Sequence, residues 1–269
     1  MLRQRIITAL FLGAGIFSVI LFLPNQWLAA VFALVTLLAA REWANLISLP
    51  GQLWKITYVA LLAVMLIVVW TWVRPDHAHT VFLIAVLWWA GAVIMLAAYE
   101  PGWLHTGWLQ WILGLSGFVV LVPTWLSLVI LHEQYPALLV FLLVLVGASD
   151  TSAYFAGKRF GKNKLAPSLS PGKTREGLWS ALIISLVLAV PGMYALGLDK
   201  AVWIYFLCLS LVTVLAALIG DLFESLLKRR AGVKDSGTIL PGHGGILDRI
   251  DSLTAAAPGF MLGVYWIYG

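Results

Sequence analysis

The sequence has 269 residues, of which 62% are hydrophobic and only 11% are charged, and its formal net charge is +5. Soluble domains average roughly 45–50% apolar and about 25% charged residues, so this composition excludes an ordinary soluble protein and indicates an integral membrane protein. The single cysteine, Cys208, excludes a disulfide framework and a cysteine metal cluster.

Long apolar runs recur along the whole chain. A bilayer core of about 30 Å needs about 20 mainly apolar residues per helix, and none of the runs alternates as a barrel strand would, so they predict transmembrane α-helices. The expected fold class is all-α, a polytopic membrane bundle of about nine transmembrane helices in which residues 1–269 form a single integral membrane domain. In chain order the predicted spans are residues 6–23, 27–47, 56–73, 78–99, 108–131, 136–157, 176–197, 201–227 and 247–268.

The first apolar run and the basic residues set the expected orientation. Residues 6–23 follow Arg3 and Arg5 and form a longer run than a typical signal-peptide core, so we expect an uncleaved first helix and a cytoplasmic N-terminus. With nine alternating spans, only Arg74 and Lys200 of the 17 basic residues fall on the opposite side of the membrane. Positive charge concentrates in cytoplasmic loops, so the long connections after the sixth and eighth spans should face the cytosol.

Acidic residues interrupt the late spans. An ionisable group inside a span costs roughly 2.5–3.5 kcal/mol and usually marks a functional cavity. Asp221 and Glu224 are three residues apart, as are Asp248 and Asp251, so each pair should share a helix face. Two such helices joined by one connection could bring their carboxylates together on a cation. Oxygen ligands without a cysteine or histidine set favour a hard ion such as Mg²⁺.

A purely structural explanation is open for the same acids. They could form buried ion pairs with Lys228, Arg229 and Arg249, which lie close to them in the sequence. Three further ionisable residues inside predicted spans have no role that the sequence reveals, namely Arg41, Glu42 and Asp150.

The connection before the last span is rich in glycine. Its "PGHGG", residues 241–245, allows positive φ and can bring amide N–H groups close to an anion, and the helix that follows presents its N-terminus to phosphate. Gly244 and Gly245 are therefore candidate phosphate contacts, although a glycine-rich loop is more often a plain turn.

The other long basic connection, residues 157–177, contains the triplet "GKT". A Walker A loop would need glycine at position 167, which is Pro167, so a P-loop is excluded. The remaining basic stretch suits a triphosphate, with Lys173 as a point charge, Arg175 as a bidentate fork and Thr174 between them.

With these residues assembled, the segment from Ser225 to Asp251 resembles the signature of the phosphatidate cytidylyltransferases, also called CDP-diacylglycerol synthases. That signature reads S-x-φ-K-R-x4-K-D-x-[GSA]-x2-φ-P-x-H-G-G-φ-x-D-R-φ-D, where φ is apolar, and the chain matches every position of it. The stretches "SDTSAYFAGKRFGK" and "SPGKTREG" also resemble upstream segments of the family, so the catalytic portion is expected at about residues 147–255. Over the first five spans the likeness is mostly one of hydropathy and length.

The resemblance implies a homodimeric enzyme of the bacterial inner membrane, with its active site at the cytoplasmic face and with membrane lipids rather than nucleic acid as partners. Its substrates would be CTP and phosphatidate, and its products CDP-diacylglycerol and pyrophosphate. The family's cofactor is Mg²⁺, with K⁺ as a possible monovalent cation beside it, and the family's metal-binding aspartates match Asp221 and Asp248, with Asp251 as a further candidate ligand. The expected catalytic residues are Asp221, Lys228, Arg229, Lys234, Asp235, His243, Asp248, Arg249 and Asp251, and the expected nucleotide contacts are Lys173, Thr174, Arg175, Gly244 and Gly245.

Two other functions remain open. A CTP-dependent kinase of polyprenol or phytol would transfer the γ-phosphate and release CDP. An ion-coupled transporter is disfavoured, because its charges should spread toward the bilayer midplane and because the chain shows no convincing internal repeat.

Overall fold

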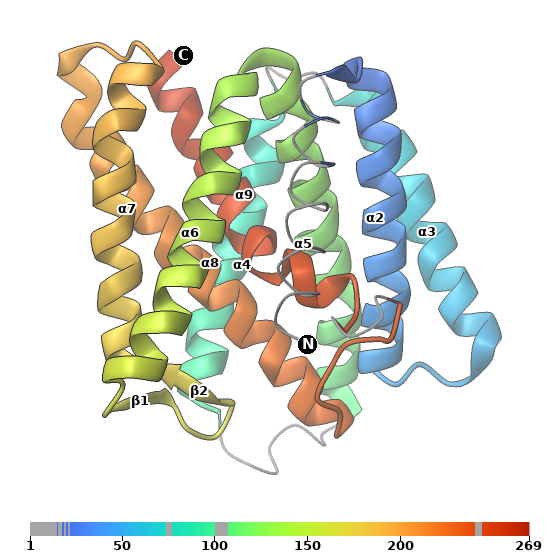
Figure 1. Ribbon diagram of the computed structural model, residues 1–269. Helices are drawn as coiled ribbons and strands as arrows, with labels where there is room; N and C mark the ends of the chain where they lie inside the picture. Colours follow the sequence, from blue (N-terminus) through green and yellow to red (C-terminus); the bar gives the residue numbers. More distant parts are fainter. Residues whose placement is uncertain are drawn as a thin grey trace.

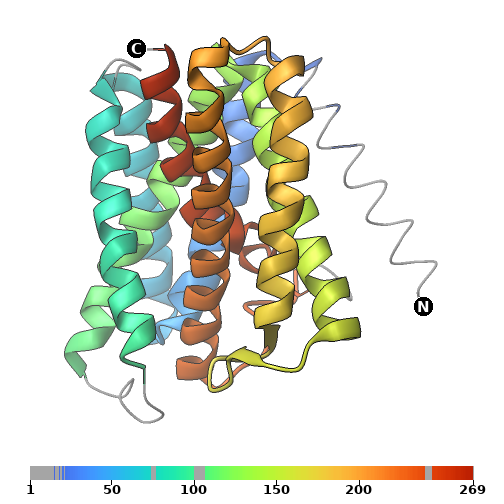
Figure 2. The same cartoon turned by 90° about the vertical axis from the view of Figure 1, so that its left-hand side faces the viewer.

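The computed structural model describes residues 15, 18, 20, 22–73, 77–99, 107–239 and 244–268. Long helices dominate this part of the chain and pack side by side as one bundle (Figure 1, Figure 2). They are α2 (Asn25–Leu46), α3 (Gly51–Trp72), α4 (His79–Ala97), α5 (Gly107–Gln134), α6 (Pro136–Phe160), α7 (Arg175–Ala195), α8 (Trp203–Ala231) and α9 (Leu247–Tyr268), and a short 3₁₀ turn, η3 (Lys200–Val202), precedes α8. The prediction of a helical membrane bundle is confirmed.

Seven of the described helices, α2 to α8, are long and apolar enough to cross a membrane. Helix α9 has 22 residues, as many as α2, but its first turns are charged and half of its residues are buried in the bundle. The predicted span 6–23 lies largely outside the described residues. The total of nine spans therefore stays a prediction, whereas the polytopic architecture is established.

A small β-hairpin, which the sequence did not predict, lies in the connection between α6 and α7. Its strands, β1 (Lys164–Ala166) and β2 (Ser170–Thr174), pair antiparallel. Pro167 follows β1, where its fixed φ and missing N–H suit a turn. The Nε–H of Arg229 donates to the carbonyl oxygen of Leu169 at 3.0 Å and fastens the hairpin to the end of α8. Figure 1 shows both at the same end of the bundle.

Helix α9 runs through the middle of the bundle, where it packs against α8, α4 and α5. Small residues of α9, Ala255, Ala256 and Ala257, are almost fully buried there. Gly220 of α8 permits the close approach of the two helices, because a Cβ at this position would collide with the carbonyl oxygen of Asp251. The acidic residues of α8 and α9 are therefore held on backbones that touch.

Pro258 interrupts the hydrogen bonding of α9. Proline has no N–H to donate to the residue four positions earlier, which is Thr254. The freed carbonyl oxygen of Thr254 instead accepts the Nε1–H of Trp89 from α4 at 3.2 Å. Oγ1 of Thr124 from α5 lies 3.1 Å from the same oxygen, and its proton is shared with the carbonyl oxygen of Val120 at 2.7 Å. Neighbouring helices thus satisfy the polar group that lipid could not, and they fix α9 in place.

Candidate active site

A cavity of about 380 Å³ lies between α6, α7, α8, α9 and the hairpin. Four aspartates line it, namely Asp150 from α6, Asp221 from α8, and Asp248 and Asp251 from α9, and Lys173 of β2 lines it as well. The structure therefore brings together the three aspartates that the sequence nominated as metal ligands. It also adds Asp150, whose role the sequence did not reveal.

Lys173 and Asp221 form an ion pair at the hairpin end of this cavity. The Nζ of Lys173 lies 2.5 Å from Oδ2 of Asp221, and both side chains keep some exposure, 21% and 29%. Lys173 reaches the cavity because it lies in β2, directly before Thr174, whose Oγ1 accepts the N–H of Gly177 at 3.1 Å and caps α7. The hairpin thus places the positive charge of Lys173 against the carboxylate of Asp221 on α8.

A second lysine, Lys228, joins α8 to α9. Its Nζ lies 2.7 Å from Oδ1 of Asp248 and 2.5 Å from Oε2 of Glu224. The other oxygen of Asp248, Oδ2, accepts the N–H of Gly245 at 2.7 Å and both the N–H and the Oγ–H of Ser236 at 2.9 Å. Asp248 is therefore held by donors on both oxygens, and its orientation is fixed.

Glu224 differs from its neighbour Asp221 although both lie on α8. Glu224 is 2% exposed and is not among the described residues that line the cavity. Its Oε1 is buried without a hydrogen-bond partner among the described residues. The ion-pair explanation thus holds for Glu224, which pairs with Lys228 outside the cavity lining. Asp248 pairs with the same lysine but also lines the cavity with Asp221 and Asp251.

Asp251 and Asp150 meet through a serine of α9. Oδ1 of Asp251 accepts the N–H of Ser252 at 2.8 Å, and the hydroxyl of Ser252 donates to Oδ2 of Asp150 at 3.0 Å. Because these contacts join α6 to α9 over about a hundred positions of sequence, local spacing carries no sign of them.

The remaining nominated residues lie apart from the cavity lining in the described part of the chain. Arg229 holds the hairpin, as described above, and the side chains of Lys234, Asp235, Arg249 and Arg175 are exposed. His243 falls outside the described residues. Their catalytic roles stay predictions.

The glycine loop uses some of its N–H groups on protein carboxylates. The N–H of Gly245 donates to Asp248, and the N–H of Ile246 donates to Oε1 of Glu42 at 3.0 Å. Gly244 has a φ of 81°, the left-handed conformation that favours glycine. A phosphate contact at Gly244 or Gly245 stays a prediction.

The donor set of the cavity fits a hard divalent ion that substrate oxygens complete. Among the described residues, no three acidic, histidine or cysteine side chains already form a metal cage. Mg²⁺ usually takes only one or two carboxylates and fills its remaining positions with water and phosphate oxygens. Asp221 and Asp248 on adjacent helices would supply that number, and a metal at this site stays a prediction.

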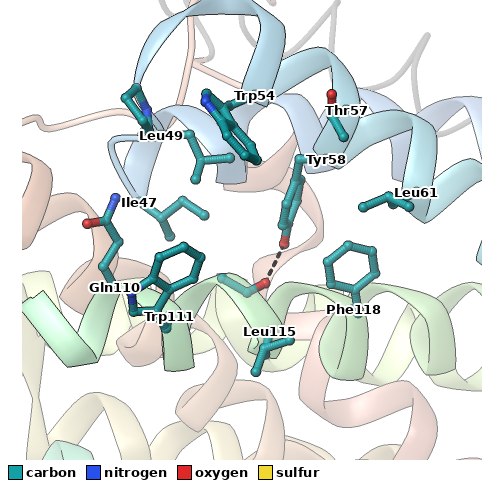
Figure 3. A pocket seen from close by; sticks show the side chains of 12 residues that line it. Ile47, Leu49, Trp54, Thr57, Tyr58, Leu61, Gln110, Trp111, Leu115 and Phe118 are labelled. Carbon is teal, nitrogen blue, oxygen red and sulfur yellow. Dashed lines mark hydrogen bonds between the residues drawn. The ribbon is translucent and has the colours of Figure 1, made fainter.

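A second cavity of about 380 Å³ lies on α3 and α5 and is lined by apolar and neutral polar residues (Figure 3). Its main polar contact is internal, since the hydroxyl of Tyr58 donates to the carbonyl oxygen of Gly114 at 2.9 Å. No charged residue is among those that line it in the described part of the chain. Of these two cavities, only the acidic one offers charged side chains among the described residues that line it.

Comparison with known proteins gives a match along the whole chain. A sequence model of the cytidylyltransferase family matches residues 3–267. A phosphatidate cytidylyltransferase of Pseudomonas aeruginosa is 40% identical over 100% of this chain and 98% of its own length, and one of Haemophilus influenzae is 35% identical over 99% and 100%. An uncharacterized protein of Escherichia coli, YnbB, is 34% identical over 91% of this chain and 81% of its own. The resemblance noted from the signature is thereby confirmed, and the chain belongs to the cytidylyltransferase family.

Proposed function

We propose that this protein transfers a cytidylyl group from CTP to phosphatidate and releases CDP-diacylglycerol and pyrophosphate. One observation carries the proposal: the family signature folds into a membrane bundle so that Asp221, Asp248 and Asp251 face one cavity with Lys173. Membership of the family and the names of the full-length relatives support the same reaction.

The chemistry calls for charge neutralisation more than for a strong base. A phosphate monoester has a second pKa of about 6, so the phosphate of phosphatidate is already a nucleophilic anion near neutral pH. One of its oxygens forms a bond to the α-phosphorus of CTP, the bond from that phosphorus to the bridging oxygen breaks, and pyrophosphate leaves with the electron pair. Two anions must approach each other in line, so catalysis consists of positioning and electrostatic stabilisation.

The residues of the cavity divide this task. Asp221 and Asp248, with Asp251, would hold Mg²⁺, which when bound would supply positive charge against the phosphate oxygens. Lys173, on the exposed hairpin end, would exchange its contact with Asp221 for the β- and γ-phosphates of CTP. Lys228 would keep Asp248 oriented from the side away from solvent. A monovalent cation such as K⁺ beside this site remains a prediction.

The lining of the cavity changes from charged to apolar along α8, which suits a lipid substrate with a phosphate headgroup. Val214 and Leu218 line it on the side of Asp221 away from the end of α8, and Leu178 and Ala181 of α7 add apolar side chains to the lining. Val214 precedes Asp221 by seven residues, which is about 10 Å along a helix. A lipid phosphate could therefore meet the aspartates while the glycerol end contacts apolar side chains.

The location follows from the same geometry. Residues 157–177, which include the hairpin, and the end of α8 carry nine of the 17 basic residues at one end of the bundle (Figure 1). This end would therefore face the cytosol of a bacterial inner membrane and receive CTP there. Association into a homodimer is part of the proposal and is testable by mass measurement in detergent.

Product identification tests the reaction directly. Purified full-length protein would be supplied with phosphatidate vesicles, CTP labelled in its base and graded Mg²⁺, and the lipid products would be resolved by mass spectrometry. We expect a nucleotide-linked lipid and pyrophosphate, and no product without a divalent ion. A merely phosphorylated lipid with release of CDP would identify a kinase, and ion flux without lipid product would identify a transporter.

A further inference from the structure

Glu42 lies in an unusual environment for an acidic residue of a membrane protein. It belongs to the last turns of α2 and is only 2% exposed. None of the ion pairs between described residues includes it. Burying a carboxylate costs free energy unless hydrogen bonds compensate for its lost hydration, so its partners indicate what it does.

Those partners belong to the start of α9 and to the loop before it. Oε1 accepts the N–H of Ile246 at 3.0 Å, and Oε2 accepts the N–H of Leu247 at 2.8 Å. The first N–H groups of a helix have no partner inside the helix, and they carry its positive dipole end. Glu42 therefore caps α9 from another helix, more than two hundred positions away in sequence.

Two glycines of the signature make room for this carboxylate. A Cβ at Gly237 would collide with Oε1 of Glu42, and a Cβ at Gly245 would collide with its Oε2. Neither glycine has a positive φ, so the conformational freedom of glycine does not explain them. The close approach of Glu42 accounts for glycine at position 237, and at position 245 Glu42 and the still nearer hydroxyl oxygen of Ser236 account for it together.

Ser236 connects Glu42 to the active site. Its hydroxyl lies 2.9 Å from Oε2 of Glu42 and 2.9 Å from Oδ2 of Asp248, and its single proton can be donated to one of them at a time. Asp248 is also the second residue of the helix that Glu42 caps. The position of Asp248 is thus coupled to Glu42 by two routes, the helix end and the serine.

From these contacts we infer that Glu42 is a positioning residue for Asp248, whose carboxylate it keeps in place at the cavity that Asp221 also lines. The inference rests on the proposed function, because it assigns Asp248 to the metal. It gives α2, which lacks the signature, a defined part in the active site.

Glu42→Gln tests the inference, because glutamine keeps the size of the side chain but has one acceptor oxygen for two backbone donors. We expect faster hydrogen exchange at the amides of Ile246 and Leu247 in the full-length protein. Outer-shell partners of metal ligands typically contribute 10–100-fold, so we expect affinity for Mn²⁺, titrated by electron paramagnetic resonance, and kcat to fall by about that factor. KM for CTP should change less than kcat.

Two controls separate positioning from general loss of stability. Glu133→Gln removes the same charge at an exposed site on α5 and should leave all readouts unchanged. Trp43→Phe, beside Glu42 on α2, removes the hydrogen bond from its Nε1–H to the carbonyl oxygen of Leu113 at 2.9 Å. It should lower the melting temperature without changing Mn²⁺ affinity per folded protein.

The possible outcomes are distinct. A Glu42→Gln protein that melts at a lower temperature but keeps wild-type Mn²⁺ affinity and kcat would make Glu42 merely structural and overturn the inference. If Glu42→Gln does not fold, Glu42→Asp replaces it, because its shorter side chain keeps the charge but withdraws the carboxylate from the N–H groups of Ile246 and Leu247. An unchanged Mn²⁺ affinity in that variant would overturn the inference as well. If the wild-type protein forms no CDP-lipid, the proposed function fails, and the exchange and Mn²⁺ measurements still decide the role of Glu42.

Discussion

Replacing Asp248 by asparagine probes the most highly connected carboxylate of the cavity. Oδ2 accepts the backbone N–H groups of Ser236 and Gly245 and competes with Glu42 for the hydroxyl proton of Ser236, and Oδ1 faces Lys228. An amide must turn its NH₂ group toward one of these two sets of donors. In the better orientation it keeps Ser236 and Gly245 and loses the charge-assisted bond to Lys228, which retains Glu224. Because a hydrogen bond to a charged group contributes about 1.5–3 kcal/mol, we expect the free energy of unfolding to fall by about 2 kcal/mol.

The effect on turnover should be much larger than the effect on stability. A bound divalent ion contributes several kcal/mol of transition-state stabilisation, and a loss of about 4 kcal/mol corresponds to a roughly 1,000-fold lower kcat. The assay is the initial rate of CDP-diacylglycerol formation at saturating CTP and phosphatidate, with membrane insertion and folding checked by fractionation and by thermal unfolding in detergent.

Asp199→Asn is the matched control for this substitution. Asp199 is exposed, and its Oδ1 accepts the N–H of Ala201 at 2.8 Å as the cap of η3, a position that asparagine also fills well. This variant should keep wild-type rates. A folded Asp248→Asn protein with a near-normal rate would refute the assignment of Asp248 to the metal.

Two further substitutions test the nucleotide contact and the packing of α9. Lys173→Met should raise KM for CTP at least tenfold, because the lost charge-assisted contact corresponds to about 1.5–3 kcal/mol. Initial rates at varied CTP concentrations measure this KM, and Lys200→Met at the opposite end of the bundle is the control. An unchanged KM would contradict the role of Lys173. Trp89→Phe removes one of two donors to the carbonyl oxygen of Thr254 and should destabilise the fold by about 0.6–1.7 kcal/mol in thermal unfolding, leaving KM unchanged. A wild-type melting temperature in that variant would show that this hydrogen bond contributes nothing.

The lysines that pair with the aspartates have a simple physical role before substrate binds. Several carboxylates on the ends of membrane helices repel one another and lose hydration, which is costly in a membrane interior. Lys173 and Lys228 each bring a positive charge to one of them. Of the two, only Lys173 comes from the hairpin, so it can move without disturbing the packing of α8 against α9.

The sequence by itself determined the helical membrane class, the main helices and the family. Backbone groups in lipid must be satisfied within the segment, so long apolar runs allow little besides helices, and the bounds of α9 agree with the predicted 247–268. The three-residue spacing also placed Asp248 and Asp251 on a common face, and both line the cavity.

Only the tertiary structure decided what meets these aspartates. Spacing on α8 suggested that Glu224 would accompany Asp221, but Glu224 is buried and pairs with Lys228 one turn along the same helix. Asp221 pairs instead with Lys173, which the hairpin brings from a distant part of the chain. Glu42 and Asp150 join the site through contacts that span 205 and 102 positions of sequence. Hydrophobic periodicity reports which side of a helix avoids water, and it carries no information on which distant helix that side touches.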